Sequence, residues 1–349
     1  MNPVLVEVHR KNRVESCHRG SAIAVSCTGE TVFSIGNTER NIYPRSALKL
    51  FQAIPLIETG AADHYGLTKE EIALACASHN GENRHASAVE KWLARLGLSA
   101  DDLENGPAFP MFDPARCRMI SDRSGPTRLH HNCSGKHAGM LALSKYIHAG
   151  TSGYSEYDHP SQVAWMNILS ELVDVDIRSL EWERDGCGLP AICMPMERLA
   201  YGCALFARPD RVGGTRGQAM LKILQAIASR PDMVAGTDRC DTAVLVATSG
   251  KIIVKTGAEA VYAGMVPGQG VGFALKIDDG ASRGSEVALG ALLKQIGALD
   301  GLPCRGLDRY FQPEIMNSQG RLTGRILPSA AWSTRRTPCT APGYSTKKP

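Results

Sequence analysis

Residues 44–49 are Pro-Arg-Ser-Ala-Leu-Lys, and they stand where a run of short β-type segments changes to a helical pattern. Three strands are expected before this stretch, at 4–9, 21–27 and 31–35, with a hairpin turn at 28–30. From Ser46 a helix is expected to run to about Thr59, with a kink at Pro55. The stretch therefore marks the change from an N-terminal sheet to a helical region.

The pattern stays helical through the middle of the chain and then returns to strands. A capping box at 68–71 begins a helix that ends near Ser78. Further helices are expected at 84–96, 136–149, 160–173, 190–207 and 215–229. After Asp241, strands are expected at 243–248, 252–256, 260–266 and 271–277, followed by a helix at 282–299.

This order of elements predicts an α+β fold in which both chain ends contribute to one antiparallel sheet. Helices flank the sheet, which is expected from about 1–45 and 240–328, and a mostly helical lobe of about 46–239 is inserted between its two parts. Residues 1–329 are thus expected to form a single domain. The remaining residues, 330–349, are rich in Ser, Thr, Pro and basic groups, which is typical of a disordered tail.

The composition argues against nucleic-acid binding. The chain of 349 residues is 43% hydrophobic and 21% charged, close to the averages of globular proteins. Its net charge of +4 comes from the C-terminal end, because six basic residues and no acid follow from Arg321 onward, and the remainder has 33 basic against 35 acidic residues. Since no basic patch is interleaved with aromatic residues, no nucleic-acid partner is expected.

Membrane insertion and export are not expected either. No run approaches the ~18 apolar residues of a membrane span, and residues 1–14 lack the charged and apolar regions of a signal peptide. The eleven cysteines have no framework spacing, which is typical of reduced thiols, some of them candidate metal ligands. We therefore expect a cytoplasmic protein.

Ser46 and Lys49 form the first candidate catalytic pair. On a helix, residues three apart share a face, so the hydroxyl and the amine are expected within hydrogen-bonding reach. A lysine whose pKa is lowered by burial or by a neighbouring cation can activate a serine for attack on an amide. The spacing alone is weak, because Ser-x-x-Lys arises about once by chance in a chain of this length. Residues 345–348 repeat it.

Two further motifs follow in order along the chain. Residues 78–80, Ser-His-Asn, end the capped helix, and residues 255–257, Lys-Thr-Gly, end an expected strand. The ordered set Ser-x-x-Lys, Ser-x-Asn and Lys-Thr-Gly is similar to that of serine β-lactamases and penicillin-binding proteins. Three such motifs in order and in suitable context predict acyl transfer through serine and lysine, but they do not identify the substrate.

The charges of these residues indicate a mechanism. Lys255 near Lys49 would disfavour charge on one of the two amines and leave a neutral base. Ser46 would then attack a carbonyl carbon, and Ser78 would pass a proton to the departing group. The spacing leaves open which of the two serines is the nucleophile. Backbone N–H groups at Ser46 and just after Lys255 are candidates for the oxyanion hole.

A fourth group of residues is rich in candidate metal ligands. Residues 130–137 are His-His-Asn-Cys-Ser-Gly-Lys-His, and residues 185–188 are Asp-Gly-Cys-Gly. This density of soft and borderline ligands indicates a zinc site, with Cys133, Cys187 and a histidine as the first choice from the residues alone. The alternative is that these side chains belong to the core and to polar networks, because no Cys-x-x-Cys pair supports a metal.

Taken together, these motifs resemble the Rhizobium etli-type L-asparaginases, whose fold is related to that of serine β-lactamases and glutaminases. The matching stretches are 44–49, 77–82, 132–140, 185–190 and 255–259, and the resemblance extends from about 4 to 328. It implies a serine β-lactamase-like catalytic domain at 1–329. It also implies hydrolysis of L-asparagine to L-aspartate and ammonia by a homodimer.

The resemblance also implies which residues form the site. The two serine–lysine pairs of the family fall on Ser46, Lys49, Ser78 and Lys255. Its zinc ligands fall on Cys133, Lys136 and Cys187, which displaces the histidine. One zinc per chain would adjust substrate binding rather than activate water. The residues expected to bind substrate are Arg45, Asn80, Asp185, Ala258 and Glu259.

Arg45 and Asp185 would hold the two backbone charges of an amino acid. A guanidinium is suited to bind a carboxylate with two hydrogen bonds, and a carboxylate is suited to pair with an ammonium group. Taken singly, each is more typical of a surface ion pair. The chain departs from the family in two places: Asp241 stands where some relatives carry cysteine, and the tail after Leu327 matches nothing in the family.

Other functions remain open at this point. A β-lactamase-like hydrolase fits the motifs, but such an enzyme is expected to be exported. A glutaminase differs by one methylene of the substrate, which a pocket discriminates by only ~1–3 kcal/mol. A zinc-binding sensor module with a vestigial site is the non-enzymatic alternative, and the intact serines and lysines argue against it.

Overall fold

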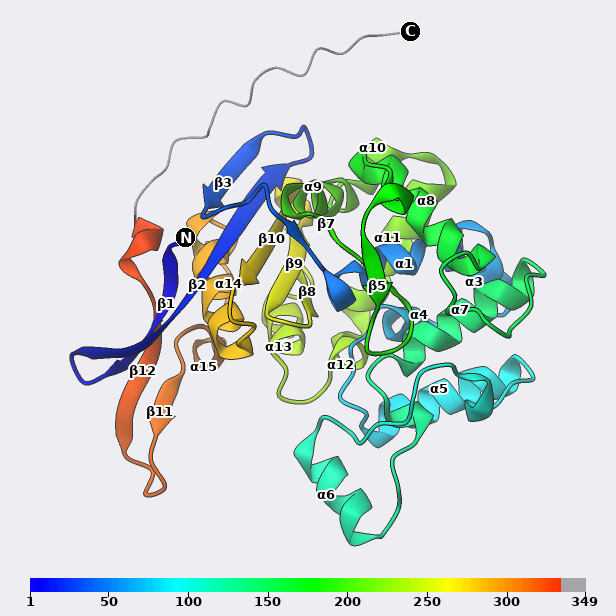
Figure 1. Cartoon of the computed structure of the whole chain (residues 1–349), viewed down its shortest axis with the longest axis horizontal. Coiled ribbons are helices and arrows are strands. Elements are labelled where there is room, and N and C mark those ends of the chain that lie inside the picture. The colour runs from blue at the N-terminus through cyan, green and yellow to red at the C-terminus, as the bar shows by residue number, and fades with distance from the viewer. Residues whose placement is uncertain (334–349) are drawn as a thin grey trace, which may run out of the picture.

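One antiparallel sheet joins the two ends of the chain (Figure 1). The computed structural model describes residues 1–333. The strand order is β11-β12-β1-β2-β10-β9-β8, and β3 pairs with the C-terminal half of β2. The strands are β1 (Val4–Arg10), β2 (Arg13–Ser26), β3 (Thr31–Ile35), β8 (Ile253–Gly257), β9 (Val261–Val266), β10 (Val271–Ile277), β11 (Glu314–Met316) and β12 (Leu322–Pro328). The predicted α+β architecture, with a sheet built from both chain ends, is confirmed.

Helices form a lobe between the two sets of strands (Figure 1). Its helices are α1 (Lys49–Gln52), α2 (Ile54–Glu58), α3 (Ala61–His64), α4 (Lys69–Ala75), α5 (Asn83–Arg95), α6 (Asp113–Ser121), α7 (Ser134–Tyr146), α8 (Pro160–Val173), α9 (Met196–Phe206), α10 (Pro209–Val212), α11 (Gly214–Ser229) and α12 (Pro231–Val234). Two short strand pairs lie within it, β4 (Asn41–Ile42) with β7 (Met194–Pro195), and β5 (Trp182–Arg184) with β6 (Pro190–Ile192). After the lobe come α13 (Cys240–Ala247), α14 (Ser282–Gln295) and α15 (Asp308–Phe311).

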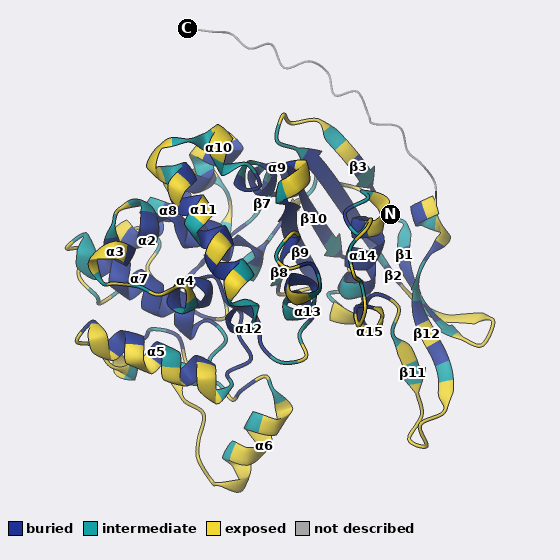
Figure 2. Ribbon diagram, turned by 180° about the vertical axis from the view of Figure 1, so that it is seen from behind, coloured by how far each residue is buried: buried dark blue, intermediate teal, exposed yellow. Residues whose placement is uncertain are grey.

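Alternate residues of the central strands enter two different hydrophobic cores. On β2, Ile23 and Val25 belong to the core shared with the lobe and α9, whereas Ala22 and Ala24 belong to the core shared with α14. Successive side chains of a strand point to opposite faces, so this sheet is covered on both sides. Figure 2 shows the burial of the central strands. At Gly272 a Cβ would lie 2.1 Å from a backbone atom of α9, so only glycine allows this close approach.

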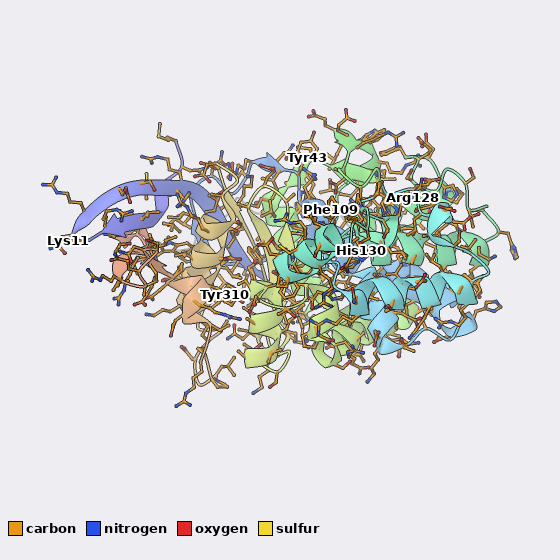
Figure 3. All side chains as sticks on the ribbon, turned by 90° about the horizontal axis from the view of Figure 1, so that it is seen from below. Lys11, Tyr43, Phe109, Arg128, His130 and Tyr310 are labelled. Atoms are coloured by element: carbon orange, nitrogen blue, oxygen red, sulfur yellow. The ribbon has the colours of Figure 1, made fainter. Side chains whose placement is uncertain are left out.

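The extremities of the molecule lie far from the central strands. α6 projects from the lobe in both views, and none of its residues is buried (Figures 1 and 2). A bridge between Ala108 and Thr127 closes the base of this excursion. Lys11, in the turn between β1 and β2, lies at one end of the long axis of the molecule (Figure 3). Among residues 1–333, no helix is long and apolar enough to cross a membrane.

Three expected elements differ from the structure. The strand expected at 243–248 is the helix α13, because a short apolar run has no periodicity that separates strand from helix. The helix expected at 190–207 begins only at Met196, after β6 and β7. The helix expected at 46–59 is broken into a 3₁₀ turn, η1 (Arg45–Leu48), and the short helices α1 and α2, with Pro55 in the first turn of α2.

The expected tail boundary at residue 330 is too early. Ala330–Ser333 form a 3₁₀ turn, η6, in which Trp332 is only 6% exposed. The indole ring stacks on Phe33 with a centroid distance of 5.7 Å, and its N–H donates to the carbonyl oxygen of Leu5 at 2.8 Å. These residues belong to the folded domain. The rest of the expected tail, 334–349, lies outside the described residues.

Candidate active site

The hydroxyl of Ser78 is the meeting point of two lysine side chains. Lys49 donates to Ser78 Oγ at 3.0 Å, and Lys255 donates to the same oxygen at 2.9 Å. The three side chains are buried, with exposures of 4% for Ser78, 0% for Lys49 and 1% for Lys255. Residues from three distant motifs of the sequence therefore form one cluster, which we call the amine cluster.

Each member of the amine cluster is held by the backbone around it. Ser78 follows α4, and its N–H donates to the carbonyl oxygen of Val234 at 2.9 Å. Lys49 also donates to the carbonyl oxygen of Ala77 and to the sulfur of Cys133, the latter at 3.1 Å. Lys255 lies on β8, at the end of the strand order, and donates to the carbonyl oxygen of Thr256 at 2.7 Å. All donors of the two amines are thus directed inward.

Gly257 brings the last motif against the first. A Cβ on Gly257 would lie 2.3 Å from the carbonyl oxygen of Pro44 and 3.4 Å from the nitrogen of Ala47. Any side chain at this position would push β8 away from η1. The glycine of Lys-Thr-Gly is therefore required by the close contact between the two motifs, which places Lys255 near Lys49.

Burial and mutual repulsion favour neutral amines in the amine cluster. Burial lowers the pKa of Lys255 to about 7, and the charges of Lys49 and Arg239 act in the same direction. Burial also lowers the pKa of Lys49, against the opposing effect of the Cys133 sulfur. A lysine with a pKa near 7 can accept and return a proton at neutral pH, which is what a general base needs.

Ser46 lies beside this cluster but outside its hydrogen bonds. It is half-buried in η1, and its hydroxyl makes no hydrogen bond within residues 1–333. The contact expected between Ser46 and Lys49 is not formed, because the Lys49 amine donates to Ala77, Ser78 and Cys133 instead. Arg45, just before it, has a φ of 54°, a strained value for a residue with a side chain.

The predicted metal ligands form a second group, which we call the thiol cluster. Cys133, Lys136 and Cys187 are 4%, 3% and 3% exposed, and the Lys136 amine lies 3.1 Å from the sulfur of Cys187. Cys187, Lys49 and Lys136 together lower the pKa of the Cys133 thiol well below its usual range. Burial opposes charge on Lys136, but the two cysteine sulfurs outweigh it and raise the pKa of this amine.

The donor set of the thiol cluster fits a soft divalent metal. Two cysteine sulfurs and a nitrogen converge in a water-poor pocket, which matches the preference of zinc for sulfur and nitrogen ligands. No group of three His, Cys, Asp or Glu side chains able to hold a metal occurs in the described part of the chain, so the third donor has to be Lys136. A lysine ligates only after losing its proton, and a metal would have to displace it.

Arg45 and Asp185 form an ion pair with each other. Two guanidinium nitrogens of Arg45 donate to one oxygen of Asp185, at 2.9 and 2.5 Å. Burial raises the pKa of Asp185, but Lys136 and Arg45 lower it by more, so the carboxylate is charged. The pair lies next to the thiol cluster, since Cys187 is two residues from Asp185. The opposite charges expected for a substrate's carboxylate and ammonium groups are thus present in one place.

The other predicted substrate residues differ in accessibility. Asn80 is buried, and its amide is engaged at both ends: it donates to Thr237 O at 2.7 Å and accepts from Arg239 at 3.1 Å. Ala258 and Glu259 are exposed in the turn between β8 and β9, where Glu259 has a φ of 58°. Asn80 therefore holds the loop of Ser78 in place, whereas Ala258 and Glu259 lie at the surface of the protein.

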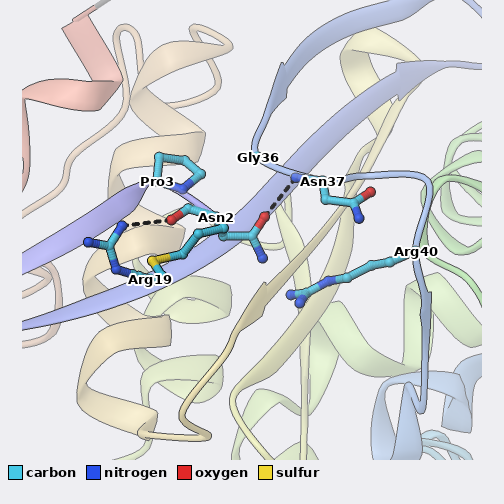
Figure 4. A pocket seen from close by; sticks show the side chains of 7 residues that line it. Asn2, Pro3, Arg19, Gly36, Asn37 and Arg40 are labelled. Atoms are coloured by element: carbon cyan, nitrogen blue, oxygen red, sulfur yellow. Dashed lines mark hydrogen bonds between the residues drawn. The ribbon is translucent and has the colours of Figure 1, made fainter.

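A surface cavity near the N-terminus shares no residue with either cluster (Figure 4). It is lined by Asn2, Arg19 and Arg40, among others. Arg19 donates to the carbonyl oxygen of Asn2 at 2.8 Å, and Arg40 pairs with Asp278 at 2.7 Å. The amine and thiol clusters, not this cavity, combine the groups that acyl transfer needs.

Comparison with known proteins identifies the family. The L-asparaginase II family matches residues 6–328. The chain belongs to the L-asparaginase II family. It is therefore an amidohydrolase of the asparaginase type, as the family resemblance implied. No curated protein sequence matches the chain.

Solved structures similar to this member of the L-asparaginase II family share little sequence with it. One is Mglu in its native form, with 14% identity, a TM-score of 0.44, and coverage of 87% of this chain and 70% of Mglu. In a second Mglu structure the chain covers 65% of that protein, with a TM-score of 0.43. Another is a putative beta-lactamase from Bacteroides dorei, with 14% identity, a TM-score of 0.39, and coverage of 75% and 87%.

Two charged residues at the site of this L-asparaginase II member were not among the predicted site residues. Arg239 contacts the loop of Ser78, and Asp241 contacts β8 beside Lys255. The only signal in the sequence is the charged stretch 238–241, which precedes an apolar run. If that run is interpreted as a strand, the charged stretch is expected to be a loop. Nothing then indicates that its side chains face the site.

Proposed function

We propose that the protein hydrolyses L-asparagine to L-aspartate and ammonia through an acyl-enzyme on Ser46. The observation that carries the proposal is the position of Ser78 Oγ, 3.0 Å from the amine of Lys49 and 2.9 Å from that of Lys255. A hydroxyl between two buried amines is suited to relay protons, whereas the half-buried Ser46 hydroxyl is free of hydrogen bonds in the described chain and accessible to a substrate. We therefore assign attack to Ser46 and proton transfer to Ser78.

The reaction proceeds in two halves. For this step the neutral Lys49 amine has to turn from its partners in the structure to Ser46. It then takes the proton of Ser46 as the serine oxygen bonds to the side-chain amide carbon, and the carbonyl oxygen becomes an oxyanion. Backbone N–H groups at Ser46 and just after Lys255 are the proposed donors to this oxyanion. Ser78 gives its proton to the departing nitrogen and takes back the proton that Lys49 received from Ser46, directly or through the neutral amine of Lys255, and ammonia leaves. Water then attacks the ester by the reverse proton path, releasing aspartate and restoring Ser46.

Arg45 and Asp185 are the proposed anchors for the backbone of the substrate. The α-carboxylate would take the place of Asp185 on the Arg45 guanidinium, and the α-ammonium would take the place of Arg45 on Asp185. This exchange conserves the number of charge-assisted hydrogen bonds, which limits the free energy lost on opening the ion pair. It also fixes the distance between the bound backbone of the substrate and Ser46. This distance favours the side-chain amide of asparagine over the longer side chain of glutamine.

Zinc is the proposed cofactor, held by Cys133, Lys136 and Cys187. When bound, it would supply a fixed positive charge for binding the substrate, because Ser46 and the amine cluster already provide a nucleophile and a base. Its ligands lie beside Asp185, on the binding side of the site rather than at Ser46. A homodimer, which the family resemblance implies, and the cytoplasmic location expected from the sequence complete the proposal.

Ammonia release by the purified protein tests the proposed function. The expected kcat/KM for L-asparagine exceeds that for L-glutamine by roughly 10- to 200-fold, the discrimination that one methylene allows. A chromogenic β-lactam serves as the control substrate and should not be hydrolysed. Equal values for the two amino acids would reassign the protein as a glutaminase-asparaginase, and β-lactam hydrolysis without ammonia release would refute the proposal.

A further inference from the structure

Arg239 and Asp241 contact two motifs of the site from a single turn. The Arg239 guanidinium donates to the carbonyl oxygen of Ser78 at 3.3 Å and to the side-chain oxygen of Asn80 at 3.1 Å. Asp241 accepts the backbone N–H of Thr256 at 2.8 Å and the hydroxyl of Tyr262 at 3.0 Å. Only Cys240 separates the two residues, at the start of α13. One turn therefore links the Ser78 loop to the strand of Lys255.

Asp241 is a buried carboxylate without a cation in direct contact. It is 0% exposed, and both of its hydrogen bonds come from neutral donors. It makes no ion pair within residues 1–333. Burying such a group is costly unless a nearby charge compensates it. The amine of Lys255 is the group on which this charge acts, because Asp241 raises the pKa that burial lowers there.

The N–H group that donates to Asp241 lies on an edge strand of the sheet. β8 ends the strand order, so Thr256 has no further strand beyond it to take this N–H. Asp241 closes that edge and fixes the backbone on which Lys255 stands. Arg239 fixes the segment that faces β8. It donates to Ser78 and Asn80, which lie on the loop that carries the second motif.

We propose that Arg239 and Asp241 are a pair of positioning residues that hold Ser78 against Lys255 and balance the charge on the Lys255 amine. The inference rests on the proposed function, because it assumes that Lys255 takes part in proton transfer. Neither residue needs to touch the substrate. Their effect is exerted through the 2.9 Å contact between Lys255 and Ser78.

The two residues act on the Lys255 amine in opposite directions. Arg239 lowers the pKa of Lys255, and Asp241 raises it, on top of the lowering by burial. Proton transfer by Lys255 requires the neutral amine, so the rate should rise with pH through the pKa of this group. Removing Asp241 should move that rise to lower pH, and removing Arg239 should move it to higher pH. A purely structural role would not produce opposite shifts.

Other charges also face Lys255 and its neighbours. Lys49 lowers the pKa of Lys255 and Cys133 raises it, whereas the Cys76 thiol is neutral because burial raises its pKa to about 12. On α14, burial and Asp241 raise the pKa of Glu286 to about 7, so this carboxyl titrates in the same range. A variant of Glu286 is therefore needed to identify the group that causes the rise.

The test is the pH profile of kcat/KM for L-asparagine in Asp241→Asn and Arg239→Gln. Asp241→Asn should shift the acidic limb down by about one pH unit and Arg239→Gln should shift it up by about as much. Asp241→Glu and Arg239→Lys should restore part of each shift. Glu286→Gln is the matched control, and its limb should stay within experimental error of the wild-type position.

Three results would overturn the inference. The first is a shift of the pH profile in the same direction for Asp241→Asn and Arg239→Gln. The second is a loss of rate in both variants with no shift of the profile. The third is a pH profile of Glu286→Gln in which the acidic limb is absent. If Asp241→Asn does not fold, as judged by its thermal unfolding, Arg239→Gln and Asp241→Glu still carry opposite expectations. A wild-type protein that releases no ammonia from asparagine refutes the proposed function instead, whereas an active wild type with unshifted variants refutes only this pair.

Discussion

Lys255 and Lys136 are the same residue type at nearly equal burial, and their surroundings act on them in opposite ways. Lys255 is 1% exposed, and burial lowers its pKa to about 7, with Lys49 and Arg239 acting in the same direction and Asp241 against them. Lys136 is 3% exposed and lies between two cysteine sulfurs, and its pKa is raised. Burial alone therefore does not decide the charge of a lysine. At Lys136 the cysteine sulfurs outweigh it, whereas at Lys255 the opposing carboxylate of Asp241 does not.

This difference divides the site into two functions. The amine cluster holds its lysines ready to exchange protons, which suits catalysis on an amide. The thiol cluster holds its lysine as a cation until a metal displaces the proton, which suits a regulated binding site. The two clusters touch at one place, where the Lys49 amine lies 3.1 Å from the sulfur of Cys133. A change in one cluster is thus expected to reach the other mainly through Lys49.

The largest expected effect follows from removing the nucleophile beside the amine cluster. Ser46→Ala should lower kcat for asparagine by at least about 10³-fold, because a nucleophile and its base act as a unit. Ser345→Ala removes the serine of the other Ser-x-x-Lys sequence and is the matched control, with unchanged kinetics expected. Steady-state ammonia release measures both. Retention of a tenth of the activity by Ser46→Ala would remove Ser46 from the mechanism.

A smaller effect is expected when the thiol cluster loses a ligand. Cys187→Ala, or chelation of the wild type, should raise KM about tenfold or more and change kcat less, the signature of lost binding. Metal analysis should find one zinc per chain in the wild type and less in the variant. Cys304→Ala serves as the control, since this cysteine is partly exposed and lies outside both clusters.

The zinc affinity should also fall as the pH falls. The thiols and Lys136 must release protons to bind the metal, so a higher proton concentration favours the metal-free form. Competition with a chelator between pH 6 and 8 measures this dependence. An enzyme that loses all turnover without zinc, while its substrate affinity stays normal, would make the metal catalytic and contradict the division between the clusters.

The smallest effects are on stability, and they should differ in sign. Lys136→Met removes the cation that contacts Cys187 and helps to lower the pKa of Cys133, and it should lower the free energy of unfolding of the metal-free protein by about 1–3 kcal/mol. Lys255→Met removes a group whose folded pKa is below its unfolded value. Below about pH 7 the folded protein holds this group as a buried cation, which lowers its stability. As the pH rises above about 7 the folded protein loses the proton and the unfolded chain keeps it, so the free energy of unfolding increases with pH.

Thermal unfolding at several pH values checks this pair. Lys255→Met should be at least as stable as the wild type at neutral pH, and it should lose the rise in stability from about pH 7 to 10. Urea unfolding of the chelated proteins gives the corresponding free energies. Destabilisation of equal size in both variants would show that the lysines differ less than their surroundings indicate.

The sequence predicted the parts of the site that short motifs encode. Lys49, Ser78 and Lys255 are distant along the chain, yet the motifs predicted one site, and the structure brings them together. The sheet from both chain ends was predicted from the order of elements. The direction of the Lys49 amine was not, because it depends on the break between η1 and α1, which spacing along an ideal helix does not reveal.

The contribution of α13 was also outside the reach of the sequence. Its apolar run fits a strand and a helix equally well, and the outcome depends on packing against β8. In the sequence, Asp241 was distinguished only as a departure from relatives, and no pattern distinguished Arg239. Their importance comes from contacts between segments 78–80, 239–241 and 256–262, which no local pattern encodes.

The central claim is that Ser46 carries the acyl group, and trapping the intermediate tests it most directly. Ser78→Ala should slow the proton relay while leaving the Ser46 nucleophile in place. Rapid quenching of this variant with asparagine, followed by peptide mass spectrometry, should find one aspartyl group on the peptide that contains Ser46. Ser46→Ala under the same conditions should show none. An aspartyl group on Ser78 in the Ser46→Ala protein, or ammonia release by the wild type with no adduct at any time point, would contradict the account.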